Sequence, residues 1–483
     1  MTRTGSLLAF SAFATALALA PGLPAQGTDL ARRIASAPDG LVKMTYASRD
    51  GVCGDGRSFI AEVASSARGH EVWFADGMSM SGVGGDIAAR CVRGPVRLLL
   101  VVRDHRVVAV QPFVGPSSPA TERAGTEIGS VPVADVSRYL LELAAQGREE
   151  IARNAMLAAT VADSVRIARS LAALAQNKAL ASSVRESALR WVGRTAAREG
   201  DREAMRVPRI IAEDAGDGLE VRERAIRVIG EEPDGAAYLR TLYPRLDQST
   251  LRERTVRVVG ESGTRSDIDW IRGIALDRSE RTMIRERAVR VIGEMSNARA
   301  LRELYDQLDD PTLRERVLRS MAEVGDSESR TWLRAIVERK TETTALRERA
   351  IRSLAEMGDM DYLRTTYRSL DDDGLRERIL RSVAEGGGTE TTAWLRDIAR
   401  DSRERSAIRE RAVRLLAESG AATSELISLY DAVPDRVVRD RLVTLLAERG
   451  DRAARDKLRA IASDDPDEDL RRRAVRKLAE SRN

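Results

Sequence analysis

The chain has 483 residues, of which 43% are hydrophobic, 32% charged and only 4% aromatic. This length is too great for one ordinary compact domain, unless the chain grows as an array of repeats. Its 79 basic and 75 acidic residues leave a net charge of +4, and so small an excess in a dense mixture of signs is not typical of a strong polyanion binder.

Residues 1–25 have the features of an export signal. Arg3 supplies the positive charge, and an apolar stretch follows over 7–20. Cleavage is expected after Ala25, or earlier after Ala20. An uncleaved membrane anchor is the alternative, but the stretch is short for a bilayer span. We therefore expect an exported protein, periplasmic or extracellular, with no transmembrane segment in the mature chain.

Residues 26–130 differ in pattern from the rest of the chain. Strands are predicted over 40–47 and 70–75, and a β-hairpin over 96–113 with a polar turn at 103–106. We expect a small mixed α/β or β domain here. The proline- and serine-rich segment 114–127 is expected to be the linker to the following region.

The only two cysteines, Cys53 and Cys91, both fall in this first region. In an oxidising compartment an isolated pair most simply forms a disulfide, and two free buried thiols are the alternative. His70 and His105 are the only histidines, too few to complete a metal site with cysteines that are expected to pair. We expect no catalytic residue, metal, cofactor or enzymatic activity; Cys53 acting as a nucleophile with a distant histidine is the alternative.

From near Val133 the pattern is helical, and one segment recurs to the end of the chain; a representative copy is "LRERAIRSLAEMGD", residues 346–359. Aligned on their first apolar residue, the copies begin at Ile151, Val184, Val221, Leu251, Ile284, Leu313, Leu346, Leu375, Ile408, Val438 and Leu470. A period near 31 residues is the signature of a repeat array. We predict an α-solenoid of about eleven helix pairs over residues 131–483.

A longer period of about 62 residues is superimposed on the shorter one. It separates Trp270, Trp332 and Trp394, and it also separates the tyrosines Tyr243, Tyr305, Tyr367 and Tyr430. Duplication of a block of two helix pairs explains this spacing. We therefore interpret the tryptophans as packing residues in the first helix of every second pair.

Each copy of the segment has an apolar face and a charged face. Leu346, Ala350 and Leu354 share one arc of a helix, which is the face to be buried. Opposite them, glutamate and arginine alternate four residues apart in a favourable order, so the face is expected to be close to neutral. We call these residues the charge ladder: Glu223, Arg227, Glu253, Arg257, Glu286, Arg290, Glu315, Arg319, Glu348, Arg352, Glu377, Arg381, Glu410 and Arg414.

A small residue recurs just before the last glutamate of the segment. It is Ala355 in the copy quoted above and Gly230, Gly260 or Gly293 in earlier copies. A small side chain at the same turn of successive helices predicts the close approach of another backbone.

The pattern "LRERA…L…GD", followed by a second short helix, resembles HEAT repeats of the short kind found in phycobilisome-lyase-like HEAT proteins. The resemblance covers roughly Val133 to Asn483. It implies that the second helix of each pair lines a concave surface and that the charge ladder lies on it. It implies nothing about activity. The lyase activity in the name of the family is not carried over to this chain, because the repeats are only the scaffold.

These observations favour an exported scaffold that binds another protein, of unknown identity, through the concave face. The alternative is that the domain holding Cys53 and Cys91 binds an envelope component while the repeats are purely structural. Nucleic-acid binding is not expected, because each ladder arginine has glutamates four residues away. Inter-repeat salt bridges could also account for every ladder charge.

Overall fold

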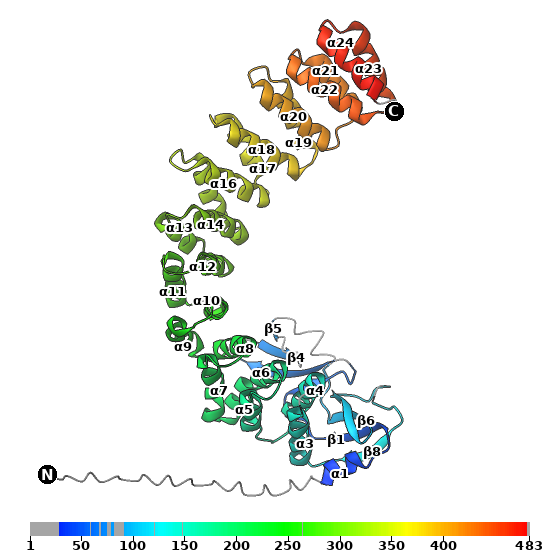
Figure 1. The fold of residues 1–483 in the computed structure, drawn as a ribbon, viewed down its shortest axis with the longest axis vertical. Helices are drawn as coiled ribbons and strands as arrows, with labels where there is room; N and C mark the ends of the chain where they lie inside the picture. Colours follow the sequence, from blue (N-terminus) through cyan, green and yellow to red (C-terminus); the bar gives the residue numbers. More distant parts are fainter. Residues whose placement is uncertain are drawn as a thin grey trace, which may run out of the picture. The chain divides into compact units, whose positions relative to one another are not determined.

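The structure is a computed structural model and describes residues 29–57, 59–66, 69–74, 79–81, 91–119, 121–146, 148–262 and 264–480. The predicted export signal lies outside the described residues. The chain divides into two compact units, Met1–Glu232 and Pro233–Asn483. Mixed β structure occupies the beginning of the first unit, and helices follow in both units (Figure 1).

The first unit contains two four-stranded sheets. One has the order β7-β6-β1-β8, formed by β7 (Arg106–Phe113), β6 (Val96–Arg103), β1 (Gly40–Tyr46) and β8 (Thr126–Ser130). Its strands pair antiparallel except β1 with β8, which are parallel. The other sheet joins successive antiparallel strands, β2 (Val52–Gly54), β3 (Ile60–Ser66), β4 (Gly69–Phe74) and β5 (Ser79–Ser81).

The predicted hairpin is confirmed as β6 and β7. Asp104 and His105 form its turn, with φ of 48° and 58°. Two consecutive residues with positive φ are typical of the type I′ turn, whose twist matches that of the flanking strands. The strands predicted over 40–47 and 70–75 correspond to β1 and β4.

Cys53 and Cys91 form a disulfide, as the sequence predicts. The neighbouring residues Gly54 and Val92 pair as an antiparallel bridge.

The prediction that residues 114–127 form a linker is wrong. Val114 is fully buried and its carbonyl accepts a hydrogen bond from the Gly56 amide at 2.8 Å. The Ser118 hydroxyl in turn donates to the Gly56 carbonyl at 2.6 Å. The segment therefore packs on the loop after β2 and then returns to the sheet as β8. Its composition is that of a linker, but contacts with residues distant in sequence order it.

The first sheet packs on the first helices. Tyr46 at the end of β1 donates to the carbonyl of Ala158 in α4 (Glu149–Thr160) at 2.8 Å, and burial raises the pKa of its hydroxyl. Asn154 of the same helix donates to the Val110 carbonyl of β7 at 2.9 Å. The short helix α1 (Asp29–Ala35) contacts α3 (Val133–Ala145). The strands and the first helices thus share one compact unit.

The other helices of the first unit continue the pattern in pairs. They are α5 (Ala168–Gln176), α6 (Ser182–Glu199), α7 (Arg202–Glu213) and α8 (Leu219–Gly230).

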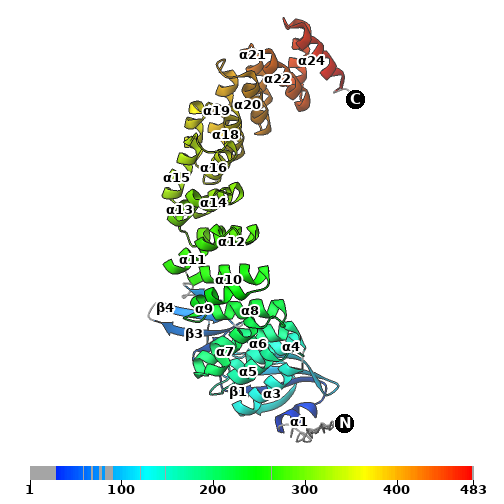
Figure 2. The ribbon, with the colours of Figure 1, turned by 60° about the vertical axis from the view of Figure 1, so that its left-hand side comes forward.

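The second unit is a helical solenoid built from repeated pairs, in which odd-numbered helices come first and even-numbered helices second (Figure 2). Every predicted segment start lies in a second helix. The helices are α9 (Gly235–Leu242), α10 (Ser249–Ser262), α11 (Arg265–Leu276), α12 (Thr282–Glu294), α13 (Ala298–Gln307), α14 (Pro311–Val324), α15 (Ser327–Glu338), α16 (Thr344–Glu356), α17 (Met360–Thr366), α18 (Asp373–Gly386), α19 (Thr389–Arg400), α20 (Ser406–Glu418), α21 (Thr423–Ala432), α22 (Arg436–Arg449), α23 (Arg452–Asp464) and α24 (Glu468–Glu480).

The small residue of the segment allows second helices to pack closely, but against a side chain rather than a backbone. A Cβ built on Gly293 would lie 2.8 Å from the Cβ of Ser320 in α14, and one on Gly260 would overlap the Val291 side chain in α12. The predicted close approach is therefore confirmed, but the predicted neighbour is wrong, because it is a side chain and not a backbone. Apolar side chains such as Ile351 and Leu354 are fully buried in the same seam.

The tryptophans pack as predicted. Trp332 in α15 meets Tyr305 edge to face, with ring centroids 5.0 Å apart, and both side chains are buried. Tyr243–Trp270 and Tyr367–Trp394 repeat this geometry at 5.2 and 5.3 Å. Burial and the charge of Glu342 raise the pKa of the Tyr305 hydroxyl.

Trp332→Ala should destabilise the second unit by about 3–5 kcal/mol, because it removes a large buried side chain and leaves a cavity beside Tyr305. Urea unfolding followed by circular dichroism measures this. Met283→Ala is the matched control, since Met283 is 52% exposed, and it should change stability little. Equal effects of the two substitutions would contradict the packing role.

Reducing the disulfide should raise amide hydrogen exchange in β2 and β3 while leaving α9–α24 protected, because the second unit is compact by itself. In the chain-entropy model the 38-residue loop is worth roughly 4 kcal/mol. Hydrogen-exchange mass spectrometry with and without reductant tests the expectation. Loss of protection in both units together would show that they unfold cooperatively.

Candidate functional site

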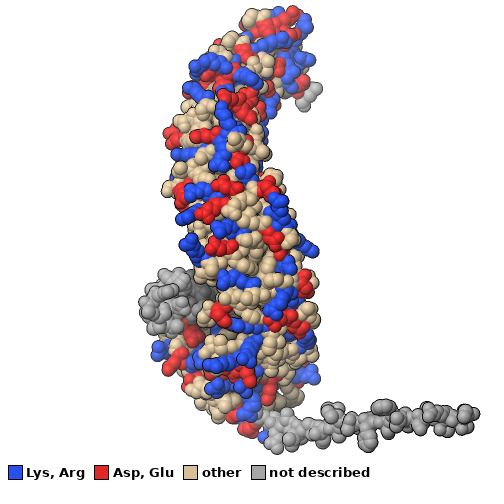
Figure 3. Space-filling model, turned by 90° about the vertical axis from the view of Figure 1, so that its left-hand side faces the viewer, with Lys and Arg blue, Asp and Glu red and all other residues tan. Residues whose placement is uncertain are grey.

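The charge ladder lies entirely on second helices. Glu223 and Arg227 are on α8 of the first unit, and the remaining ladder residues follow on α10, α12, α14, α16, α18 and α20 of the second. Basic and acidic side chains are interspersed on the face of the molecule in Figure 3, without a broad field of either sign. Four positions of each segment are named as follows. In the copy beginning at Leu346 these are the first arginine Arg347, the glutamate Glu348, the second arginine Arg349 and the outer arginine Arg352.

In many pairs the first arginine bonds to the end of the first helix. The Arg285 Nε donates to the carbonyl of Ala275 at the end of α11, at 2.9 Å. Arg347 makes the same bond to Val337 at 2.8 Å. Such a bond satisfies one of the last carbonyls of the first helix, which have no partner within the helix. The sequence did not predict this role.

Many first arginines also pair with a carboxylate in the loop of the following pair. Arg252 reaches Glu280 at 2.6 Å, and Arg314 reaches Glu342 at 2.8 Å. Arg314 also lies over the ring of Tyr305, 4.1 Å from its centroid. The aromatic cluster and the ion pair therefore form one junction, which returns with the longer period.

The pair Arg185–Asp217 shows most clearly the electrostatics of an ion pair between a first arginine and the following pair. Arg185 contacts both carboxylate oxygens of Asp217, at 2.6 and 2.5 Å, and donates through Nε to the Ala175 carbonyl at 2.8 Å. The side chains of Arg185 and Asp217 are only 5% and 3% exposed. Burial raises the pKa of Asp217, but hydrogen bonds from Arg185 and the Gly218 amide outweigh it and leave the pKa below its ordinary value.

The glutamate of the segment often binds the second arginine of the following pair. Glu348 accepts from Arg378 at 2.8 Å, and Glu410 accepts from Arg441 at 2.9 Å. Glu253 pairs with Arg287 in the same way. These bridges run between neighbouring second helices, so part of the ladder stabilises the stack.

The pairing predicted within a helix occurs only at some positions. Glu410 lies 3.2 Å from Arg414, and Glu315 lies 3.7 Å from Arg319. Arg257 pairs with the later glutamate Glu261, at 3.6 Å. Ladder glutamates therefore pair both along their own helix and with the neighbouring helix, which competes for them.

Three outer arginines make no ion pair with any residue that the structure describes: Arg290, Arg352 and Arg381. The Nε atoms of all three are buried and have no acceptor. Burial and the neighbouring charges of Arg349 and Arg378 lower the pKa of Arg352. Burial and the charges of Arg290 and Arg319 likewise lower the pKa of Arg316, although Glu323 and Glu286 oppose this.

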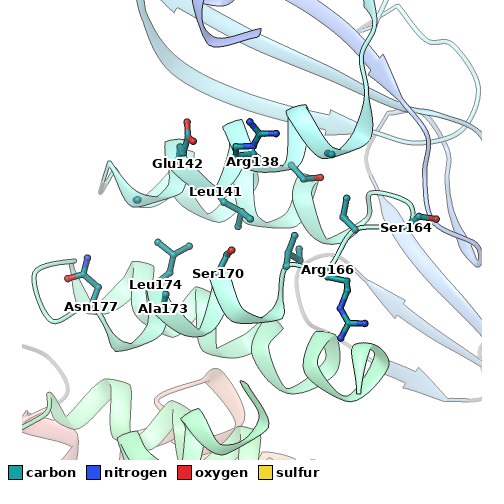
Figure 4. A pocket seen from close by; sticks show the side chains of 14 residues that line it. Arg138, Leu141, Glu142, Ser164, Arg166, Ser170, Ala173, Leu174 and Asn177 are labelled. Carbon is teal, nitrogen blue, oxygen red and sulfur yellow. The ribbon is translucent and has the colours of Figure 1, made fainter. Parts of the chain in front are cut away.

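A second candidate site is a groove of about 640 Å³ between α3 and α5 in the first unit. Its walls include Leu141, Ala145 and Leu174, with Arg138 and Arg166 among its polar residues (Figure 4). Leu141 of α3 lies opposite Ser170 and Leu174 of α5. No sequence pattern predicts this groove, because it depends on how far apart two consecutive first helices lie.

Groups that could carry chemistry are sparse in the described residues. No cluster of three or more His, Cys, Asp or Glu in that part of the chain could hold a metal ion. His105 is exposed in the β6–β7 turn, and its Nδ1 lies 2.7 Å from the Ala35 carbonyl. Each helix that the structure describes is too short or too polar to traverse a bilayer.

Comparison with known proteins identifies HEAT repeats in one part of the chain. A family model of HEAT repeats matches residues 274–355. Importin β is similar over 72% of this chain and 53% of its own, at 13% identity and a TM-score of 0.36. Human deoxyhypusine hydroxylase in complex with glycerol is similar over 59% of this chain and 99% of its own, at 18% identity and a TM-score of 0.25.

Kap121p bound to Pho4p is similar over 73% of this chain and 45% of its own, at 13% identity and a TM-score of 0.38. The chain thus spans about half the length of the importin β and Kap121p structures. None of the curated proteins matches the sequence. The chain therefore contains HEAT repeats within a mainly helical solenoid that follows a small mixed β-sheet domain.

Arg185→Met should destabilise the first unit by about 3–5 kcal/mol, because it leaves the buried Asp217 carboxylate without its partner. The double variant Arg185→Met/Asp217→Leu should regain a large part of this loss. Urea unfolding of the three proteins measures both effects. A double variant as unstable as the single one would show that the ion pair itself, rather than the unpaired charge, determines stability.

Proposed function

We propose that the protein is an exported scaffold that binds another protein through the charge ladder. The observation that carries the proposal is the presence of ladder residues on consecutive second helices of the second unit, which creates one long repeated surface. HEAT repeats in residues 274–355 support it, because this fold is typical of protein-binding scaffolds. The proposal includes no cofactor, nucleic acid or catalysis.

The packing of the second unit supports the inner face as the binding face. Consecutive second helices, such as α12 and α14, contact each other more extensively than consecutive first helices, such as α11 and α13. In a curved stack, the layer whose helices lie closer together is the inner one. A charged inner surface gives specificity and register to a bound protein more than raw affinity.

The disulfide supports export. Disulfides persist in oxidising compartments and are rare in the cytosol. Cys53 and Cys91 are bonded in the structure, and the predicted signal precedes them in the sequence. We propose that the mature protein begins after Ala25 or Ala20.

The alternative is binding of an envelope component by the first unit, which contains the Cys53–Cys91 domain. A candidate surface is the groove between α3 and α5, the helices that follow that domain. This groove belongs to the same compact unit as the disulfide. Its apolar wall of leucine and alanine side chains suits an apolar segment. In this alternative the repeats of the second unit are structural.

A photo-crosslinking amino acid at Glu323 tests the proposal. Glu323 is exposed near the end of α14 and lies beside the ladder. The control is Arg299, whose side chain is 76% exposed on α13, the first helix of the same pair. Both variants are irradiated with envelope extract, and crosslinked proteins are identified by mass spectrometry.

A protein crosslinked at position 323 and not at 299, and then shown to bind as a purified protein, is the expected result. Crosslinking at 299 alone would place the binding on the first helices and overturn the proposal. Amino-terminal sequencing of the protein recovered from its own cell tests export separately, and a chain that still begins at Met1 in the cytosol would contradict it.

A further inference from the structure

Arg316 is a buried arginine without a counterion. Arg316 is only 8% exposed, and its Nε has no hydrogen-bond acceptor. It makes no ion pair with the described part of the chain. At the equivalent position, Arg287 and Arg378 each bind the glutamate of the preceding helix. An unpaired buried charge is costly, so a site that retains one calls for an explanation.

Arg352 is surrounded by glutamates that are already engaged. Glu348, four residues before it, binds Arg378 at 2.8 Å. Glu356, four residues after it, binds Arg349 through two contacts of 2.9 Å. The two carboxylates that helix geometry offers to Arg352 therefore belong to other arginines.

Arg290 and Arg381 extend this arrangement to both sides. We define the arginine row as Arg290 on α12, Arg316 on α14, Arg352 on α16 and Arg381 on α18. All four have a buried Nε without an acceptor. Outside the row, the outer arginines Arg257 on α10 and Arg414 on α20 each have a carboxylate partner. Each of these four consecutive second helices thus carries an arginine without an ion pair among the described residues. On α14 it is the second arginine, because the outer arginine Arg319 pairs with Glu315, and the second arginine Arg411 of α20 is unpaired in the same way.

The row is a set of cations on neighbouring second helices, and none of them makes an ion pair with a described residue. The pKa of Arg316 and of Arg352 is lowered by burial and by neighbouring arginines, so both would be stabilised by an added negative charge. Arginine donates from a planar fork that matches a carboxylate, and such charge-assisted bonds are strong. The row therefore suits an anionic ligand that spans several helices.

The surrounding glutamates restrict which anion fits. Each outer arginine has a glutamate one turn before it and another one turn after it along its helix, as Glu286 and Glu294 flank Arg290. A polyanion of uniformly high charge, such as nucleic acid, would be repelled by both flanking rows. A chain whose carboxylates are separated by neutral residues can place each carboxylate on an arginine and avoid the glutamates.

Spacing gives the periodicity of this ligand. Packed helices lie about 8–10 Å apart, whereas an extended peptide advances about 3.3 Å per residue. One helix is therefore crossed in about three residues. We propose that the arginine row binds an extended segment of a partner protein that carries an acidic residue at about every third position. This inference rests on the proposed function and names the chemistry of the partner.

Synthetic peptides test the spacing with the full mature protein. The first peptide repeats Glu-Ser-Thr, the second has the same composition with its glutamates contiguous, and the third replaces each glutamate of the first with lysine. Fluorescence anisotropy measures the three affinities. The affinity of the spaced acidic peptide should be at least about tenfold higher than that of the contiguous one, and the lysine peptide should not bind. Equal binding of the two acidic peptides would overturn the inference, as would tighter binding of single-stranded DNA.

Substitutions in the arginine row test whether its residues bind the peptide. Arg290→Gln/Arg352→Gln/Arg381→Gln should weaken binding of the spaced peptide about tenfold or more. The matched control is Arg278→Gln/Arg299→Gln/Arg452→Gln, which removes three exposed arginines that lie outside the charge ladder and should leave the affinity unchanged. Equal losses in both proteins would show a general effect of charge and contradict the inference.

Arg316→Gln separates binding from folding. Removing a buried charge that has no counterion should leave the Tm unchanged or raise it, while the affinity for the spaced peptide falls. A lowered Tm would assign Arg316 to the stability of the stack and remove it from the row. If position 323 crosslinks a partner whose affinity is insensitive to all these substitutions, the scaffold function stands and the acidic-segment inference fails.

Discussion

The structure of the second unit depends on the fact that a helix pair cannot bury its apolar face by itself. Ile351 and Leu354 become inaccessible only because other helices pack over the seam of α16. Close packing at this seam fixes the register between consecutive second helices, since Gly293 has room for little more than a hydrogen beside Ser320. Once the register is fixed, charged side chains of one helix lie at set positions relative to those of the next.

The charged residues of each segment consequently have different tasks. The first arginine satisfies a carbonyl at the end of the first helix and often reaches a carboxylate of the next pair, as Arg252 does with Glu280. The glutamate and the second arginine connect neighbouring second helices, as Glu348 and Arg378 do. Some outer arginines pair with a glutamate of their own helix, whereas Arg290, Arg352 and Arg381 make no ion pair with a described residue and are available to a ligand. The division also fails beside these residues, because Arg316 binds no glutamate and Arg349 binds Glu356 of its own helix.

The first unit combines strands and helices in one compact structure. Tyr46 and Asn154 connect the first sheet to α4, and the segment expected to be a linker instead completes that sheet through β8. The disulfide and the groove between α3 and α5 belong to the same unit. This groove combines an apolar wall with the charged residues Arg138, Glu142 and Arg166, and so differs in chemical character from the ladder.

The sequence by itself determined the repeat architecture, because the helical period and the recurring apolar positions are local properties of the chain. It also determined the hairpin at Asp104 and His105, the pairing of Cys53 with Cys91 and the packing role of Trp332. Only the tertiary structure decided which carboxylate each arginine binds. Glutamates four residues away and glutamates on the adjacent helix compete for the same guanidinium, and distances within one helix cannot resolve that competition. For the same reason the unpaired Arg316 and the displaced partners of Arg352 became visible only when the helices were stacked.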